Sequence, residues 1–147
     1  MLPDQEAFFI FVAMEKVAFI INPFSAKKNY QPFLNELKAK VQNPLYYISE
    51  SIAGTDDFIQ QHINNVSIFV AIGGDGTIST VAKNLIHTNK ILAIFPAGSG
   101  NGFSNETQFS KNLDELLEKL KSGKSRKIDT FTVNERLSIN VSGTGFD

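Results

Sequence analysis

The stretch from Ser67 to Thr77, SIFVAIGGDGT, decides the fold. Its first six residues form a short apolar run without alternation, which is typical of a strand buried on both faces of a parallel sheet. The glycines that follow allow a sharp turn, and residues 78–86 carry apolar side chains at helical spacing. A buried strand, a glycine turn and a helix in this order predict main-chain N–H groups and a positive helix end facing a polyphosphate.

The same alternation of apolar runs and helical patterns extends through most of the chain. It predicts an α/β fold, with a doubly wound, mostly parallel sheet flanked by helices. Ligands bind such sheets at the carboxyl ends of the strands. We expect strands at 17–21, 45–49, 67–72 and 91–95, and helices at 32–41, at 56–63 with acidic residues at its start, at 78–86 and at 113–120.

The pattern changes after Asp129, where 130–133 and 136–141 are typical of two antiparallel strands joined at Asn134-Glu135. We therefore expect a nucleotide-binding α/β domain at residues 1–129 and the first strands of a second, truncated β domain at 130–147. The apolar residues of these strands predict self-association through an exposed edge. They are Phe131, Val133, Leu137, Ile139 and Val141.

A second glycine-rich loop, Pro96 to Gly102 (PAGSGNG), follows another predicted strand, and Asn22-Pro23-Phe24-Ser25 follows the first. Parallel strands end at one edge of a sheet, so three loops would line one concavity there. Asp75 would repel a phosphate unless a divalent cation bridged them, which predicts a Mg²⁺ site. The alternative is a tight turn that caps a helix. Lys27 and Lys28 fit either a phosphate contact or a solvated loop.

Together the motifs NPFS (22–25), GGDGT (73–77) and PAGSGN (96–101) resemble the catalytic domain shared by diacylglycerol kinases, sphingosine kinases and bacterial lipid kinases. The resemblance covers the chain from Val17 onward. GGDGT also occurs in NAD kinases, but these lack PAGSGN at this place. Two departures are Gly102, where many bacterial diacylglycerol kinases have aspartate, and Ala26, where the family usually has glycine.

The resemblance implies ATP and Mg²⁺ as cofactors, with Asp75 as a catalytic residue and Asp75 and Asp129 as metal ligands. It also implies that the general base and the lipid-binding cleft lie downstream of residue 147, so the chain alone is expected to be inactive. The implied nucleotide-binding residues are Asn22, Pro23, Ser25, Ser49, Gly73, Gly74, Asp75, Gly76, Thr77, Gly98, Ser99, Gly100 and Asn101.

The charge, cysteine content and apolar runs of the chain limit the kinds of function it can have. With 14 basic and 15 acidic residues, the chain has no overall charge to attract nucleic acid. The absence of cysteine excludes disulfides and thiolate metal sites, and fits a cytoplasmic location. The apolar run Ala7–Ala13 is too short to span a bilayer, so membrane contact would be peripheral, at the inner surface. The basic stretch 119–127 fits such a contact. We favour the alternative interpretation, in which its lysines complement the dipole at the C-terminal end of a helix.

The sequence thus predicts the ATP-binding half of a kinase that transfers the γ-phosphoryl group to a lipid hydroxyl, as in diacylglycerol or sphingosine. Two alternatives stay open. One is an NAD kinase-like small-molecule kinase with the same phosphate loop. The other is a non-catalytic nucleotide-binding module.

Overall fold

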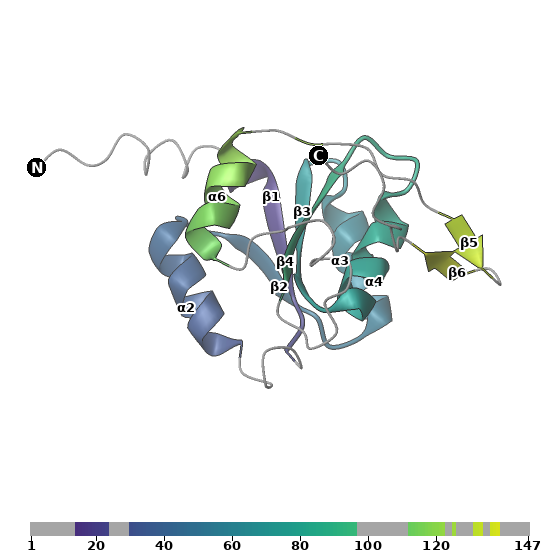
Figure 1. Ribbon diagram of the computed structural model, residues 1–147, viewed down its shortest axis with the longest axis horizontal. Helices are drawn as coiled ribbons and strands as arrows, with labels where there is room; N and C mark the ends of the chain where they lie inside the picture. Colours follow the sequence, from purple (N-terminus) through teal and green to yellow (C-terminus); the bar gives the residue numbers. More distant parts are fainter. Residues whose placement is uncertain are drawn as a thin grey trace, which may run out of the picture.

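A computed structural model describes residues 14–23, 30–96, 112–122, 125, 131–133 and 136–138. Its centre is a parallel sheet of four strands in the order β2-β1-β3-β4 (Figure 1). The strands are β1 (Val17–Ile21), β2 (Leu45–Ile48), β3 (Ile68–Gly73) and β4 (Ile91–Pro96). Because β1 and β3 are neighbours although β2 lies between them in sequence, the strand order reverses at the β1/β3 boundary. Open α/β sheets bind ligands at such a switch point.

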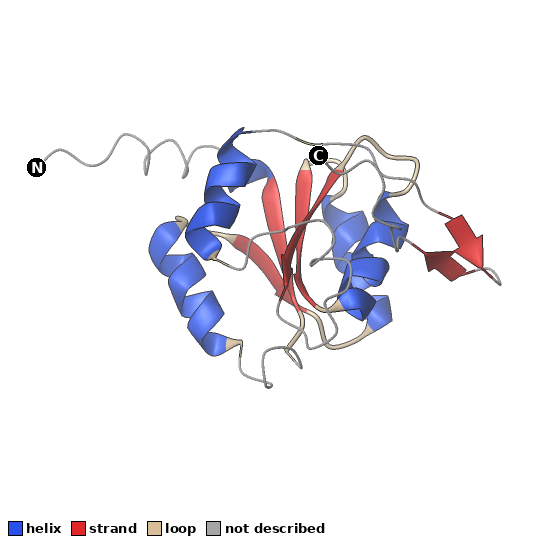
Figure 2. Cartoon of the chain, viewed as in Figure 1, coloured by secondary structure: helices blue, strands red, loops and turns tan. Residues whose placement is uncertain are grey.

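Helices cover both faces of this sheet (Figure 2). Helices α2 (Gln31–Lys40) and α6 (Leu113–Ser122) lie on one face, and α3 (Ile52–His62) and α4 (Asp75–Leu85) lie on the other. A 3₁₀ turn, η1 (Met14–Lys16), precedes β1. The predicted α/β fold class is confirmed, and so are the four predicted strands, within two residues at each end.

The side chains of β1 explain why its sequence does not alternate. Ala18 and Ile20 pack into a core cluster with α3 and α4, whereas Val17, Phe19 and Ile21 pack into a second cluster with α2 and α6. All five are at most 1% exposed. A strand buried on both faces has no polar side to display, so its sequence is a continuous apolar run.

Helices α2 and α6 are also joined by a polar contact. Lys40 of α2 donates hydrogen bonds to Asp114 of α6 and to Glu36 on its own helix. These bonds, first that to Asp114 and then that to Glu36, raise the pKa of Lys40 above its ordinary value. The contact is exposed, so it contributes little to stability.

The prediction that a helix starts at Asp56 with acidic residues in its first turn is wrong. Helix α3 begins four residues earlier, at Ile52, because Ser51 is its N-cap: the Ser51 hydroxyl accepts a hydrogen bond from the Gly54 N–H at 2.9 Å. Its first turn holds no acidic residue. The capping serine marks the start of the helix, which the spacing of apolar residues alone did not reveal.

The predicted start of the next helix at residue 78 is also late. Helix α4 begins at Asp75, with Gly74 as its N-cap, and the Ile78 N–H donates to the Gly74 carbonyl oxygen at 3.0 Å. Asp75, Gly76 and Thr77 therefore form the first helical turn instead of a loop before the helix. The glycine motif includes the helix start.

Strands β5 (Phe131–Val133) and β6 (Arg136–Ser138) pair antiparallel in a separate two-stranded sheet. That they open a second domain, and that their edge drives self-association, stay predictions. Across the described ranges, none of the helices has the length and apolar character needed to cross a membrane.

Candidate phosphate-binding site

The carboxyl ends of the parallel strands bring distant motifs to one edge of the sheet. The Asn22 N–H, just after β1, donates to the carbonyl oxygen of Ile72 in β3 at 2.9 Å. On the other side, the Ser49 N–H, just after β2, donates to the Ile21 carbonyl oxygen at 2.8 Å. Asn22, Ser49 and Gly73 thus lie side by side, at the edge we call the rim.

Strand β4 ends at the same rim, because its last residue, Pro96, is the register partner of Gly73 in β3. The predicted glycine-rich loop after Pro96 lies outside the described residues. The remaining predicted site residues fall outside the described residues: Ser25, Gly98, Ser99, Gly100, Asn101 and Asp129, together with Lys27 and Lys28.

A hydrogen bond between side chains joins the first two motifs. The Asn22 Nδ2 donates to the Thr77 Oγ1 at 2.9 Å, across 55 positions of sequence. Thr77 is only 8% exposed, although it lies in the first turn of a helix at the rim. The side chains of these two predicted nucleotide-binding residues are therefore in contact with each other.

The glycines of GGDGT have different surroundings. A Cβ at Gly73 would lie 2.6 Å from the Thr77 Oγ1 and 2.9 Å from the Thr77 Cβ, so no larger residue fits there. Among the described residues, a Cβ at Gly76 would meet nothing within 4 Å. Gly73 is therefore explained by packing inside the protein. Gly76 faces open space, where a bound phosphate could approach the main chain.

The start of α4 has the features of an anion site. Among the residues that the structure describes, no side chain caps this helix at Gly74. The N–H groups of the first turn, which have no partner within the helix, and the positive end of the helix dipole therefore lie at the rim. Asp75 is exposed in the same turn. An acidic residue there stabilises the helix even without a ligand, so its position fits both the capping alternative and a metal-bridged phosphate.

Magnesium binds protein sites through one or two carboxylates together with substrate phosphates. The exposed Asp75 carboxylate at the rim is a donor of the required type, so the site fits the expected ion. In the described ranges, no group of three or more His, Cys, Asp or Glu side chains could enclose a metal by itself.

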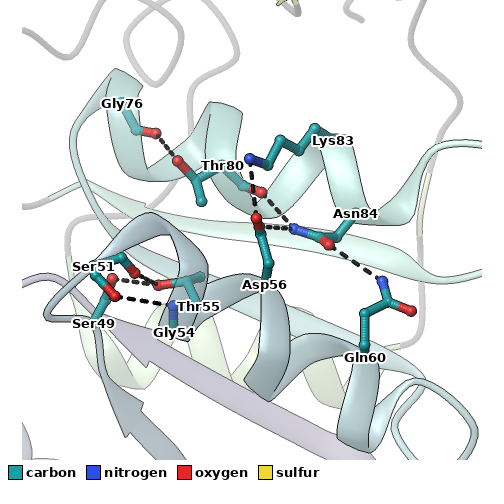
Figure 3. Close-up of polar contacts among 10 residues, drawn as sticks. All are labelled: Ser49, Ser51, Gly54, Thr55, Asp56, Gln60, Gly76, Thr80, Lys83 and Asn84. Carbon is teal, nitrogen blue, oxygen red and sulfur yellow. Dashed lines mark hydrogen bonds and ion pairs between the residues drawn. The ribbon is translucent and has the colours of Figure 1, made fainter.

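A cluster of hydroxyls next to Ser49 was not predicted from the sequence. The Thr55 hydroxyl donates to the Ser51 carbonyl oxygen at 2.9 Å, and the Ser49 and Thr55 hydroxyls are 2.5 Å apart (Figure 3). Because the single proton of Thr55 is directed to Ser51, Ser49 is the donor in the second bond. The Ser49 hydroxyl is thus engaged inside the protein, and Thr55, 1% exposed, fixes it.

Helices α3 and α4 are held together by polar contacts further from the rim (Figure 3). Asn84 of α4 donates to Asp56 of α3 at 2.7 Å and accepts a hydrogen bond from Gln60 at 3.2 Å. Lys83 forms an ion pair with the same aspartate at 3.3 Å. Asp56, which the sequence placed at a helix start, instead joins the two helices whose N-termini meet the rim.

Comparison with known proteins shows which family the chain belongs to. The family model of the diacylglycerol kinase catalytic domain matches residues 16–133, most of the chain. The chain belongs to this family. The match includes every described residue of the rim, from Asn22 to Pro96.

Members of the family occur among the relatives. A diacylglycerol kinase of Staphylococcus aureus (strain bovine RF122) is 25% identical over 138 residues, which are 89% of this chain and 44% of the relative. An uncharacterized protein of Synechocystis is 27% identical over 143 residues, covering 87% of this chain and 33% of the relative. The chain therefore spans less than half the length of these relatives.

The fold also matches solved structures of the family. The crystal structure of a diacylglycerol kinase from Bacillus anthracis str. Sterne aligns with a TM-score of 0.68 and 22% identity. The alignment covers 84% of this chain and 47% of that one. At this identity the likeness supports the fold alone, and the fold is the one that the apolar strand pattern predicted.

Proposed function

We propose that this chain forms the ATP-binding half of a lipid kinase, which transfers the ATP γ-phosphoryl group to a lipid hydroxyl. The observation that carries the proposal is the start of α4, where an uncapped helix end, the open face of Gly76 and the exposed Asp75 lie at the β1/β3 switch point. Membership of the diacylglycerol kinase catalytic domain family supports it.

In the proposed mechanism, the main-chain N–H groups at the start of α4 bind phosphate oxygens and orient the triphosphate. Asp75, with Asp129, would hold Mg²⁺, which neutralises the charge that develops on the transferred group. The glycine-rich loop after Pro96 would cover the nucleotide with Gly98, Ser99, Gly100 and Asn101. The base that accepts the lipid proton is not assigned to a residue of this chain.

The domain organisation belongs to the proposal too. Residues 1–129 would form the nucleotide-binding domain, and 130–147 would begin a β-rich domain that presents the lipid. A cytoplasmic enzyme with a lipid substrate would act at the inner membrane surface, through peripheral contact.

The test uses the full-length protein with the substitution Asp75→Asn. We expect it to abolish ATP-dependent phosphorylation of diacylglycerol or sphingosine in mixed micelles and to leave the circular dichroism spectrum unchanged, because only the charge that holds the metal is lost. Asp57→Asn is the matched control, since Asp57 is an exposed carboxylate in the interior of α3, six residues after the N-cap Ser51. It should leave turnover unchanged.

The same assay separates the alternatives. Phosphorylation of NAD, with none of the lipids, would replace the proposal by an NAD kinase-like activity. ATP binding without transfer to any acceptor would support a non-catalytic module. Retained lipid phosphorylation by the Asp75→Asn protein would refute the metal role of Asp75.

A further inference from the structure

The hydrogen bond between Asn22 and Thr77 joins the ends of two strands at the switch point. Asn22 follows β1, and Thr77 lies in the helix that follows β3. Asn22 is bound to this neighbouring unit twice, through its side chain to Thr77 and through its main-chain N–H to the Ile72 carbonyl oxygen. The exit of β1 and the first turn of α4 are therefore held at a fixed separation.

Gly73 makes this contact possible. Besides its clash with Thr77, a Cβ at Gly73 would lie 3.2 Å from the Asn22 Cβ. The two side chains together fill the space that a larger residue would need. We call Asn22, Gly73 and Thr77 the rim latch.

The Thr77 side chain is poorly placed to serve as a separate phosphate ligand. Its oxygen already accepts a hydrogen bond, and the residue is 8% exposed. Little of the side chain is therefore open to a phosphate. The main-chain N–H groups of the same turn, next to the open face of Gly76, meet a ligand without breaking any side-chain contact.

We propose that Asn22 and Thr77 are positioning residues that act as one unit, in which the rim latch sets the shape of the nucleotide site and neither side chain is an independent ligand of ATP. This rests on the proposed ATP-binding function. Removing either partner breaks the whole unit, so removing the second partner has little further effect. The losses of ATP binding free energy in the two single variants should therefore not add in the double variant.

A double-mutant cycle on the full-length protein tests this, with Asn22→Ala, Thr77→Val and the double variant. Valine keeps the shape of threonine, including its packing on Gly73, and removes only the hydroxyl. We expect each single variant to weaken ATP binding, measured by isothermal titration calorimetry, by about tenfold, and the double variant by no more than either single one. Thr77→Ser keeps the hydroxyl and should retain near-normal affinity.

Independent ligands would give a different result. If the fold-losses of the two single variants multiply in the double variant, to about a hundredfold, the proposal is overturned. It is also overturned if Thr77→Ser binds ATP as poorly as Thr77→Val, since the hydroxyl would then not matter. A loss of folded protein alone would not change the affinity of the molecules that remain folded, so the affinity cycle reports on the site.

Failure of the proposed function can be distinguished from failure of the latch. If the unmutated protein binds no ATP, the proposed function falls. The same cycle, read by urea denaturation, then decides the latch: non-additive changes in the free energy of unfolding support it, and additive changes overturn it.

Discussion

Helices α3 and α4 begin at the same edge of the sheet, but only one of them is capped by its own side chain. In α3, the Ser51 hydroxyl accepts from the Gly54 N–H, and the Ser51 carbonyl oxygen accepts from the Thr55 N–H at 3.1 Å. In α4, the N-cap is Gly74, which has no side chain to offer. Figure 3 shows Ser51 and Gly76 at the same end of the paired helices.

Under the proposed function, the difference explains why only one of the two helix ends at the rim would bind phosphate. Sheet topology places both N-termini at the strand ends, so topology alone makes both of them candidates. The capping residue selects between them, because a capped helix has already used an N–H donor that an anion would need. Four substitutions would break or sharpen this comparison.

The largest expected effect separates the two glycines next to the uncapped end. Gly73→Ala should lower the free energy of unfolding by about 1–3 kcal/mol, because its Cβ overlaps Thr77. Gly76→Ala should leave stability unchanged or raise it by about 0.5 kcal/mol, because its Cβ meets nothing and alanine favours the helix. Urea denaturation measures both.

The nucleotide affinity of these variants provides the second half of this test. Gly76→Ala should weaken ATP binding in calorimetric titration, since its methyl group occupies the space in which a phosphate would approach the helix. Equal stability losses in the two variants, or unchanged ATP affinity for Gly76→Ala, would show that the open face of Gly76 is not the ligand side.

The next effect follows from giving α4 a cap of its own. Gly74→Asp should keep or raise the free energy of unfolding by a few tenths of a kcal/mol, yet weaken ATP binding at least about tenfold. The carboxylate would accept hydrogen bonds from the N–H groups that the phosphates need, and its negative charge would repel the phosphates. Gly74→Asn is the matched control: it caps without charge, and its loss of affinity should be smaller. A Gly74→Asp protein that binds ATP normally would contradict the comparison.

The smallest effect comes from removing the cap of α3. Ser51→Ala should lower the free energy of unfolding by about 1 kcal/mol, because the Gly54 N–H loses its acceptor. ATP affinity should stay within about twofold, as the capped helix end does not bind phosphate. A tenfold loss of affinity in calorimetry, with the protein still folded, would place the nucleotide at α3 as well.

The sequence by itself determined the fold class. The runs VAFII and SIFVAI are apolar throughout because β1 and β3 are buried on both faces, and a pattern of that kind is local and readable. It also indicated a turn at GGDGT, because adjacent glycines between a buried strand and a helix allow the chain to reverse sharply. The helix starts at Ser51 and Gly74 were missed because a cap depends on one residue, whereas apolar spacing emerges only further along the helix.

Tertiary structure alone decided how the site residues are used. Nothing local in the sequence shows that Asn22 donates to Thr77, that Thr77 fills the space beside Gly73, or that Ser49 bonds to Thr55, since these contacts join elements distant in the chain or facing surfaces of different turns. Sequence spacing fixes which residues reach the rim of a parallel sheet. Packing across that rim then decides which side chains contact each other and which residues leave their main chain open to a ligand.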